Sequence, residues 1–287
     1  MYAPQFDYYR ASSIAEAGSL LRKYPGAKLL AGGHSLIPLL KLRLTSPPVV
    51  IDIGRINELK GINATQSTIR IGSLTTHAEL AASPIILEQC PALAEAAAQI
   101  GDPAVRNRGT IGGNVAHADP ASDLPAVLTA LGARFVITGP NDNRTEDAAR
   151  FFQGMMTTVL GEHDMLTAIE IPSKSAGQGM AYAKFIHPAS RYAVIGVAAV
   201  LTVSNGKCTA ASIVLGGLVP RPVRASSVEK ALVGQTLSTD VIAKAANQVG
   251  GDLGTDIIGD IFASAGYRKA VAPVWVKRAL TEAAQRI

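Results

Sequence analysis

The segment AKLLAGGHSL, residues 27–36, constrains the fold more than any other part of this sequence. Its apolar residues predict a short strand that ends in the pair Gly32–Gly33. Glycine loses more conformational entropy on folding than any other residue, so the pair indicates a position where the backbone must turn sharply or approach another group closely. Consecutive backbone N–H groups in such a turn can attract an anion, and His34 and Ser35 add side-chain donors.

A second glycine-rich segment, RGTIGGNVAHADPASD at residues 108–123, repeats this arrangement. Thr110 can donate a hydroxyl group to a phosphate, and Gly112 and Gly113 leave the backbone open to a ligand. Side chains suited to ribose hydroxyls follow at Asp119, Ser122 and Asp123. A lone glycine pair is more often an ordinary strand-to-helix turn, but two such segments favour a ligand with two ends or one diphosphate held from both sides.

The residues alone do not identify that ligand. The Gly-x-Gly-x-x-Gly fingerprint of Rossmann turns and the Gly-Lys-Ser/Thr ending of the P-loop are both missing from the sequence. The residues therefore indicate only that the ligand is a dinucleotide, or a similar diphosphate, that is not bound on a Rossmann turn.

The N-terminal part is predicted to form a small α/β unit that ends at about residue 56. SSIAEAGSLLRKY (12–24) has the pattern of a helix that Ser12 or Ser13 can cap, and Ser13 and Glu16 have the spacing of a capping box. PPVVIDI (47–53) predicts a strand that begins after its prolines.

The remaining chain is predicted to form two further parts. Residues 101–125 have little periodicity and are expected to form a long functional loop within the second part. Beyond residue 177, strand-like segments precede helical ones, and the last helix is expected over APVWVKRALTEAAQRI. The sequence thus predicts an α+β protein with one domain at 1–176, divided at residue 56 into subdomains 1–56 and 57–176, and another at 177–287.

Composition excludes several classes of protein. Hydrophobic residues make up 48% of the chain and charged residues 17%, which is typical of a globular core. The net charge of +5 is scattered, so we expect no nucleic-acid surface, and no apolar segment has the length of a membrane span. Cys90 and Cys208 are expected to be buried, reduced thiols in a cytoplasmic protein, and no spacing of ligands predicts a metal site.

The two glycine segments together resemble the FAD-binding medium subunits of the molybdenum hydroxylase (xanthine dehydrogenase) family. The string TIGGN-x-A-H-x-D-P-x-x-D (110–123) is highly specific for that family, and AGGHSL (31–36) is moderately specific. The resemblance covers essentially the whole chain and is strongest to the aerobic carbon monoxide dehydrogenase type.

The resemblance implies a two-subdomain FAD-binding fold of the vanillyl-alcohol-oxidase (PCMH) type, followed by an α+β domain of the carbon monoxide dehydrogenase flavoprotein type that closes over the flavin. The two glycine loops would hold the diphosphate from opposite sides, two aspartates would lie near the cofactor, and a lysine and a tyrosine would lie near the isoalloxazine ring. The matching positions are Ala31, Gly32, Gly33, His34, Ser35, Leu36, Thr110, Ile111, Gly112, Gly113, Asn114, Asp119, Asp123, Lys184 and Tyr192.

The resemblance also implies a multi-subunit oxidoreductase, arranged as a dimer of heterotrimers. A large subunit would oxidise substrate at a molybdenum centre, a small subunit would pass electrons through two 2Fe–2S clusters, and FAD on this chain would deliver them to an external acceptor. No catalytic side chain is expected here, because the chain binds and tunes the flavin. A bulky residue at Gly112 is expected to abolish flavin binding without unfolding the chain.

Several alternatives stay open at this point. The complex could oxidise carbon monoxide, an aldehyde or an N-heterocycle, and its acceptor could be quinone, NAD or oxygen. The chain could also be a free-standing FAD oxidoreductase, or an assembly subunit without cofactor. His77 is expected to be a satisfied surface or packing residue, and Met155 and Met156 are expected to belong to the core.

Overall fold

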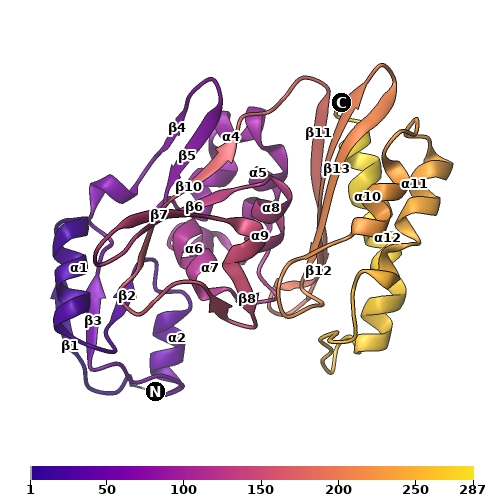
Figure 1. Cartoon of the computed structure of the whole chain (residues 1–287). Coiled ribbons are helices and arrows are strands. Elements are labelled where there is room, and N and C mark those ends of the chain that lie inside the picture. The colour runs from indigo at the N-terminus through magenta and orange to yellow at the C-terminus, as the bar shows by residue number, and fades with distance from the viewer. Residues whose placement is uncertain (1) are drawn as a thin grey trace.

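The computed structural model describes residues 2–287 and builds its N-terminal unit on a parallel three-stranded sheet (Figure 1). The sheet has the order β1-β3-β2, from β1 (Asp7–Arg10), β2 (Lys28–Leu30) and β3 (Val49–Asp52). Helices α1 (Ile14–Lys23) and α2 (Leu36–Lys41) connect its strands. This confirms the predicted α/β unit, although the analysis missed β1, which has no fully buried side chain.

The start of α1 and its N-cap Ser13 are as predicted, but the reciprocal hydrogen bond of the capping box differs. The Ser13 side chain accepts a hydrogen bond from the backbone N–H of Glu16, at 3.1 Å. The Glu16 carboxylate accepts from the backbone N–H and the hydroxyl of Ser12, at 2.8 and 2.5 Å, instead of from Ser13. The backbone N–H groups of Glu16 and Ser12 at the start of the helix therefore both have acceptors. Ser13 and Ser12 each make one of the two interactions that a single serine makes in a capping box.

The second part is a five-stranded antiparallel sheet with helices packed on it. Its order is β4 (Ile62–Ala64), β5 (Thr68–Gly72), β10 (Met165–Pro172), β6 (Arg134–Thr138) and β7 (Asn143–Asp147). The short elements around it are η1 (Asn57–Leu59), α3 (His77–Ala82), α4 (Pro84–Gln89), α5 (Pro91–Gln99), α8 (Leu124–Ala130), α9 (Ala148–Phe151) and the hairpin β8 (Phe152–Gly154) and β9 (Thr157–Thr158).

The prediction of a continuous loop over 101–125 is wrong. This segment contains α6 (Pro103–Arg106) and α7 (Ile111–His117). Asp102 and Thr110 cap the two helices by accepting hydrogen bonds from Val105 N (2.8 Å) and Gly113 N (3.1 Å). Capping and tertiary packing outweigh the low helix propensity of the glycines here, and helices this short leave no periodic pattern in the sequence.

The C-terminal sheet is antiparallel and buried on both faces. It consists of β11 (Gln178–Ile186), β12 (Ala193–Ser204), β13 (Lys207–Gly216) and β14 (Val223–Arg224). Alternate residues such as Tyr182 and Ala198 join the core of the second part, whereas their neighbours, such as Ala199, join a separate core. Burial on both sides explains the nearly continuous apolar run in β12.

Helices cover the outer face of the C-terminal sheet (Figure 1). They are α10 (Ser226–Leu232), α11 (Thr239–Ala246), η2 (Val249–Gly251) and α12 (Ala265–Ala284). The predicted order of strands before helices is confirmed. The last helix begins earlier than predicted because Ser264 caps it and Pro273 lies inside it, although proline usually marks a helix start or break.

Among residues 2–287, no helix combines the length and the apolar character that a membrane crossing requires. Cys90 and Cys208 are both buried and free, as predicted from their spacing.

Three aromatic rings, those of Phe135, Phe151 and Phe152, pack against one another in the core of the second part. Phe135 lies 4.5 Å from Phe151 and 5.8 Å from Phe152, measured between ring centroids, and is fully buried. Phe135→Ala should lower the free energy of unfolding by about 3–5 kcal/mol, because it removes a buried ring and leaves a cavity. Chemical denaturation measures this, and Tyr2→Ala, at a position 89% exposed, should change it by no more than about 0.5 kcal/mol.

Candidate functional site

A cavity of about 940 Å³ lies between the parallel-sheet unit and the second part of the chain. The parallel-sheet unit contributes residues of β2 and the following turn, the second part contributes α7 and the β8–β9 hairpin, and residues 190–192 reach it from the C-terminal sheet. This volume lies at the upper end of the range for sites that hold a large organic ligand.

The first glycine segment forms one wall of the cavity and offers free backbone donors. Gly33 has a φ of 78°, a conformation that glycine adopts at low cost. The N–H groups of Gly32, Gly33, His34 and Ser35 have no acceptor among residues 2–287. Four consecutive unpaired N–H groups at a cavity wall form a concave site suited to an anion.

The two glycine segments lie against each other. A Cβ at Gly32 would overlap the carbonyl oxygen of Arg108 and would lie 3.0 Å from the Cα of Gly109. The backbone of the first segment therefore packs directly on the start of the second, which is possible only because position 32 has no side chain. The structure thus brings together the two segments that the sequence analysis assigned to one ligand.

The second segment does not offer the backbone donors of the first. The N–H groups of Ile111 and Gly112 donate to Thr75 O (2.9 Å) and Ser73 O (2.8 Å), and those of Gly113 and Asn114 donate to Thr110. The interpretation of this segment as a second backbone cradle is therefore corrected: its N–H groups are committed within the fold. What it presents to the cavity is the Thr110 and Asn114 side chains and a floor of glycine backbone.

Twelve of the fifteen predicted site residues line the cavity, and three do not. The lining residues are Ala31, Gly32, Gly33, His34, Ser35, Leu36, Thr110, Gly112, Gly113, Asn114, Asp123 and Tyr192. Ile111 is instead buried in the core, and Asp119 accepts a hydrogen bond from Ala121 N at 2.9 Å. Lys184 has a fully buried side chain that lies behind Asp123.

Asp123 joins the cavity to the C-terminal sheet. Its carboxylate accepts a hydrogen bond from the Tyr182 hydroxyl at 2.6 Å, and Lys184 Nζ lies 2.9 Å from both of its oxygens. Lys184 also donates to Gln99 O at 3.3 Å. Burial raises the pKa of Asp123 and lowers the pKa of Lys184, and the attraction between the two charges opposes both shifts. The charged pair with its third donor satisfies the rule that buried charges must be paired.

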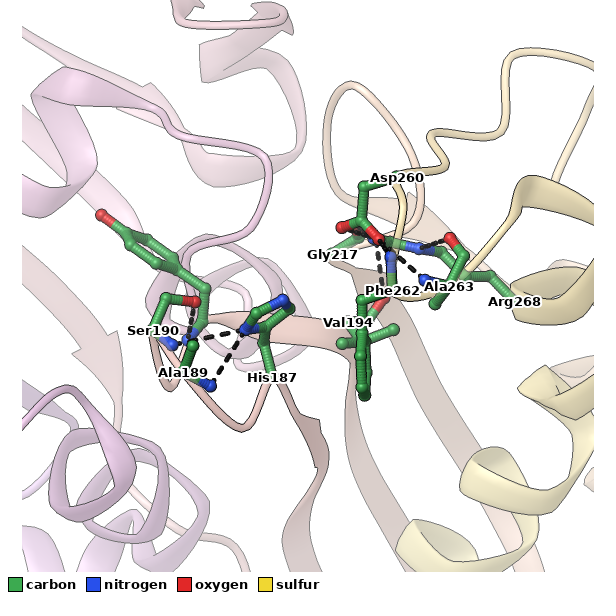
Figure 2. Close-up of polar contacts among 10 residues, drawn as sticks. His187, Ala189, Ser190, Val194, Gly217, Asp260, Phe262, Ala263 and Arg268 are labelled. Carbon is green, nitrogen blue, oxygen red and sulfur yellow. Dashed lines mark hydrogen bonds and ion pairs between the residues drawn. The ribbon is translucent and has the colours of Figure 1, made fainter.

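The turn between β11 and β12, which contains His187, Ala189 and Ser190 (Figure 2), places Tyr192 at the cavity. His187 Nδ1 holds this turn by accepting hydrogen bonds from Ala189 N at 3.2 Å and Ser190 N at 3.3 Å. Burial, followed by the charges of Asp119 and Asp123, raises the pKa of the Tyr192 phenol, so this phenol stays protonated at neutral pH.

Three further residues line the cavity that were not predicted as site residues from the sequence. His77 is 3% exposed, lines the cavity and has an Nδ1 atom with no partner among the described residues, so it is neither on the surface nor satisfied. The Ser73 hydroxyl is buried and unpartnered beside it. Met156 is 53% exposed with a φ of 50°, and its neighbour Met155 is also exposed, so neither belongs to the core. None of these three follows a pattern that marks a site in sequence.

Apolar side chains and backbone form much of the cavity wall, and the histidines that line it are His34, His77 and His117. Within the part of the chain that the structure describes, no three His, Cys, Asp or Glu side chains come close enough together to hold a metal ion. The volume and the free N–H groups of residues 32–35 are suited to binding and orienting a large anionic molecule.

The environment of Gly112 contradicts the expectation that a side chain there would leave the fold intact. A Cβ at Gly112 would lie 2.5 Å from Ser73 Cβ and 2.7 Å from Ser73 O, so backbone would have to move. Gly112→Ala should lower the free energy of unfolding by about 1–3 kcal/mol, as overpacking does. Gly113→Ala is the matched control, because its Cβ would meet only Thr110 Oγ1, at 3.0 Å. Equal stability of the two variants in urea would contradict this account.

The buried imidazole of His77 predicts a loss of stability in acid. Burial, with smaller contributions from His34 and Arg106, lowers the pKa of His77 to about 4 from 6.5. The unfolded chain therefore takes up a proton before the folded one, and stability should fall by about 3 kcal/mol as the pH decreases from about 6.5 to 4. His77→Gln should remove this decrease and His117→Gln should keep it; urea unfolding at a series of pH values measures both.

Two family models cover the chain. Residues 4–174 match the FAD binding domain in molybdopterin dehydrogenase, and residues 180–283 match the CO dehydrogenase flavoprotein C-terminal domain. The chain is 40% identical to the carbon monoxide dehydrogenase medium chain of Hydrogenophaga pseudoflava, over 99% of this chain and 98% of that protein. It is 36% identical to the glyceraldehyde dehydrogenase medium chain of Sulfolobus acidocaldarius, over 99% and 100% of the two chains.

Solved structures agree with these matches. A chain of carbon monoxide dehydrogenase from Hydrogenophaga pseudoflava superposes with a TM-score of 0.94 at 42% identity, covering 99% of this chain and 98% of that one. A chain of quinoline 2-oxidoreductase from Pseudomonas putida 86 superposes with a TM-score of 0.93 at 31% identity, covering 99% of both. The likeness extends over both glycine segments and the C-terminal sheet, and the chain belongs to the family of FAD-binding medium subunits of the molybdenum hydroxylases.

Proposed function

We propose that the cavity between the glycine segments holds FAD and that Gly32–Ser35 binds its diphosphate. The observation that carries this proposal is the row of four N–H groups at the cavity wall that have no acceptor among residues 2–287. A diphosphate supplies the oxygen acceptors that these donors require, and the glycines let it approach the backbone closely. The cavity volume of about 940 Å³ is also adequate for a dinucleotide.

In this proposal, some of the other predicted residues line the cavity and some support the loops that line it. Thr110 and Asn114 bring polar side chains to the cavity lining, and Leu36, next to the free N–H groups of residues 32–35, adds an apolar one. Tyr192 contributes an aromatic surface at the C-terminal-domain side, where a ring system can pack. Lys184 acts behind Asp123 rather than at the flavin ring, because its side chain is fully buried away from the cavity. Asp119 and Ile111 support the loops that carry these groups.

FAD supplies the redox chemistry when bound, since it can accept and release electrons where no side chain of this chain can. The protein's part is to bind and orient the ring and to limit its contact with water. The two cysteines of the chain are buried and distant in sequence, so they do not provide the thiolates of an iron–sulfur cluster. The match to medium chains of carbon monoxide dehydrogenase supports a chain that receives its electrons from partner subunits.

The chain is proposed to work in a complex of the carbon monoxide dehydrogenase type, in the cytoplasm. Its partners would be a large subunit with the molybdenum cofactor and a small subunit with 2Fe–2S clusters, as a dimer of heterotrimers. The 40% identity to a carbon monoxide dehydrogenase medium chain supports this type over aldehyde- or N-heterocycle-oxidising complexes. The two family models, at 4–174 and 180–283, support a domain boundary near residue 176.

The proposal predicts a yellow protein whose colour depends on Gly32. The purified full chain should show flavin absorption bands and release FAD on denaturation. Gly32→Ala should lower the FAD content at least about tenfold, equivalent to ~1.4 kcal/mol, because the added Cβ overlaps Arg108 O and moves the N–H groups of residues 32–35. Gly250→Ala should keep it, since a Cβ there meets nothing within 4 Å.

Failure of the wild-type chain to bind FAD, either as purified or after addition of free FAD, would contradict the proposal. Co-purification with its partner subunits identifies the substrate type, because the metal centre of the large subunit determines what is oxidised.

A further inference from the structure

The segment Pro120–Asp123 connects the cavity to the C-terminal sheet through its backbone and through its side chains. Pro120 O accepts a hydrogen bond from Gly217 N at 2.8 Å, and Ala121 O accepts one from Ala193 N at 3.0 Å. These donors stand at the ends of β13 and β12 that lie nearest the cavity. The backbone of the segment is therefore attached to the sheet at two successive residues.

The side chains of the same segment continue the connection in both directions. The Ser122 hydroxyl donates to Asn114 Oδ1 at 2.8 Å, and Asn114 lines the cavity. On the other side, Asp123 receives the Tyr182 hydroxyl at 2.6 Å and Lys184 Nζ at 2.9 Å, both from β11. Four successive residues thus link the cavity floor to three strands of the C-terminal sheet.

The sheet is built to let the Tyr182 hydroxyl reach Asp123. A Cβ at Gly196 would overlap that hydroxyl oxygen, so this position on β12 has to be glycine. Gly196 pairs with Lys184 across the two strands. The missing side chain on one strand thus makes room for the polar cluster on its neighbour.

A buried arginine, Arg268, is hydrogen-bonded to the start of β12 and to the residue after β13 (Figure 2). Arg268, which is 4% exposed, donates through Nη1 to Val194 O at 3.2 Å and to Gly217 O at 2.9 Å. Its Nη2 donates to Asp260 at 2.5 Å. Val194 follows Ala193, so the guanidinium group holds both strand ends that bond to Pro120 and Ala121.

Tyr192 lies between two strands that are bonded to the Pro120–Asp123 segment, β11 before it and β12 after it. It directly precedes Ala193, and the turn that carries it continues from β11, the strand of Lys184. Its ring lines the cavity together with Ser190 and Arg191. Any shift of β11 or of the start of β12 against the segment would therefore move Tyr192.

We propose that Asp123, Lys184 and Tyr182 are positioning residues that set where Tyr192 and Asn114 stand relative to the flavin. The inference rests on the proposed function, and it assigns these three side chains a role that does not require Lys184 or Tyr182 to touch the cofactor. The ion pair is 0% exposed at Lys184 and 4% at Asp123, so loss of one partner leaves a buried, uncompensated charge. Either protonation of Asp123 or a movement of β11 away from the segment relieves that charge, and both weaken the hold of β11 on the segment.

The test compares the cation that pairs with Asp123 with a cation elsewhere in the C-terminal domain. Lys184→Met removes the partner of Asp123, whereas Arg224→Met removes a cation of β14 that pairs with Glu229 on α10, and neither Arg224 nor Glu229 lines the cavity. Three quantities are measured on the full chain: the Tm of the FAD-free protein, the FAD dissociation constant, and the visible circular dichroism of bound flavin.

Both variants should lower the Tm, but only Lys184→Met should weaken FAD binding, by at least about tenfold (~1.4 kcal/mol), and change the flavin spectrum. Tyr182→Phe, which removes a single hydroxyl and should fold, is expected to act in the same direction with a smaller effect. Asp123→Asn combined with Lys184→Met should recover part of the lost affinity, because no unpaired charge remains.

Unchanged FAD affinity and spectrum in both Lys184→Met and Tyr182→Phe would show that the cluster only stabilises the fold, and would overturn this inference while leaving the proposed function intact. An equal loss of affinity in Arg224→Met would overturn it as well. If the wild-type chain bound no FAD, the proposed function itself would fail, and the positioning role would fail with it.

Discussion

The direct packing of Gly32 on the Arg108 carbonyl is the contact on which the rest of the site depends. It joins the parallel three-stranded unit to the second part of the chain without an intervening side chain. Backbone packed on backbone leaves little freedom for either segment, so the N–H groups of residues 32–35 are held in place before any ligand arrives. A preorganised site of this kind spends less of the binding free energy on ordering the protein.

The two glycine segments look alike in sequence but differ in what their glycines do. In the first, Gly33 adopts a positive φ and the N–H groups stay free. In the second, Gly112 lets α7 approach Ser73, and the N–H groups serve the fold. One segment presents donors and the other builds the floor beneath them. Similar local composition therefore supports two different physical functions, which only the hydrogen-bond partners distinguish.

Features that repeat along the chain could be predicted from the sequence, and features that arise from tertiary contacts could not. The helix at α1 and the strands β3 and β12 follow from periodicity and apolar runs, and residues of both glycine segments line the cavity, although the N–H groups of the second are committed within the fold. The short capped helices α6 and α7 have no such period. The burial of His77, and the place of Lys184 behind Asp123, depend on elements that meet from distant parts of the chain.

Burial of both faces of the C-terminal sheet links domain docking to cofactor binding. The inner face, with Met180, Tyr182 and Val200, completes the core of the second part, so separation of the two parts would expose a large apolar surface. The same face carries the residues that hold the Pro120–Asp123 segment. A ligand in the cavity that also contacts residues 190–192 of the C-terminal domain must stabilise this docking by the free energy that docking contributes to its affinity, because the two equilibria are thermodynamically reciprocal. The C-terminal domain is therefore a structural part of the cofactor site, although most of it lies away from the cavity.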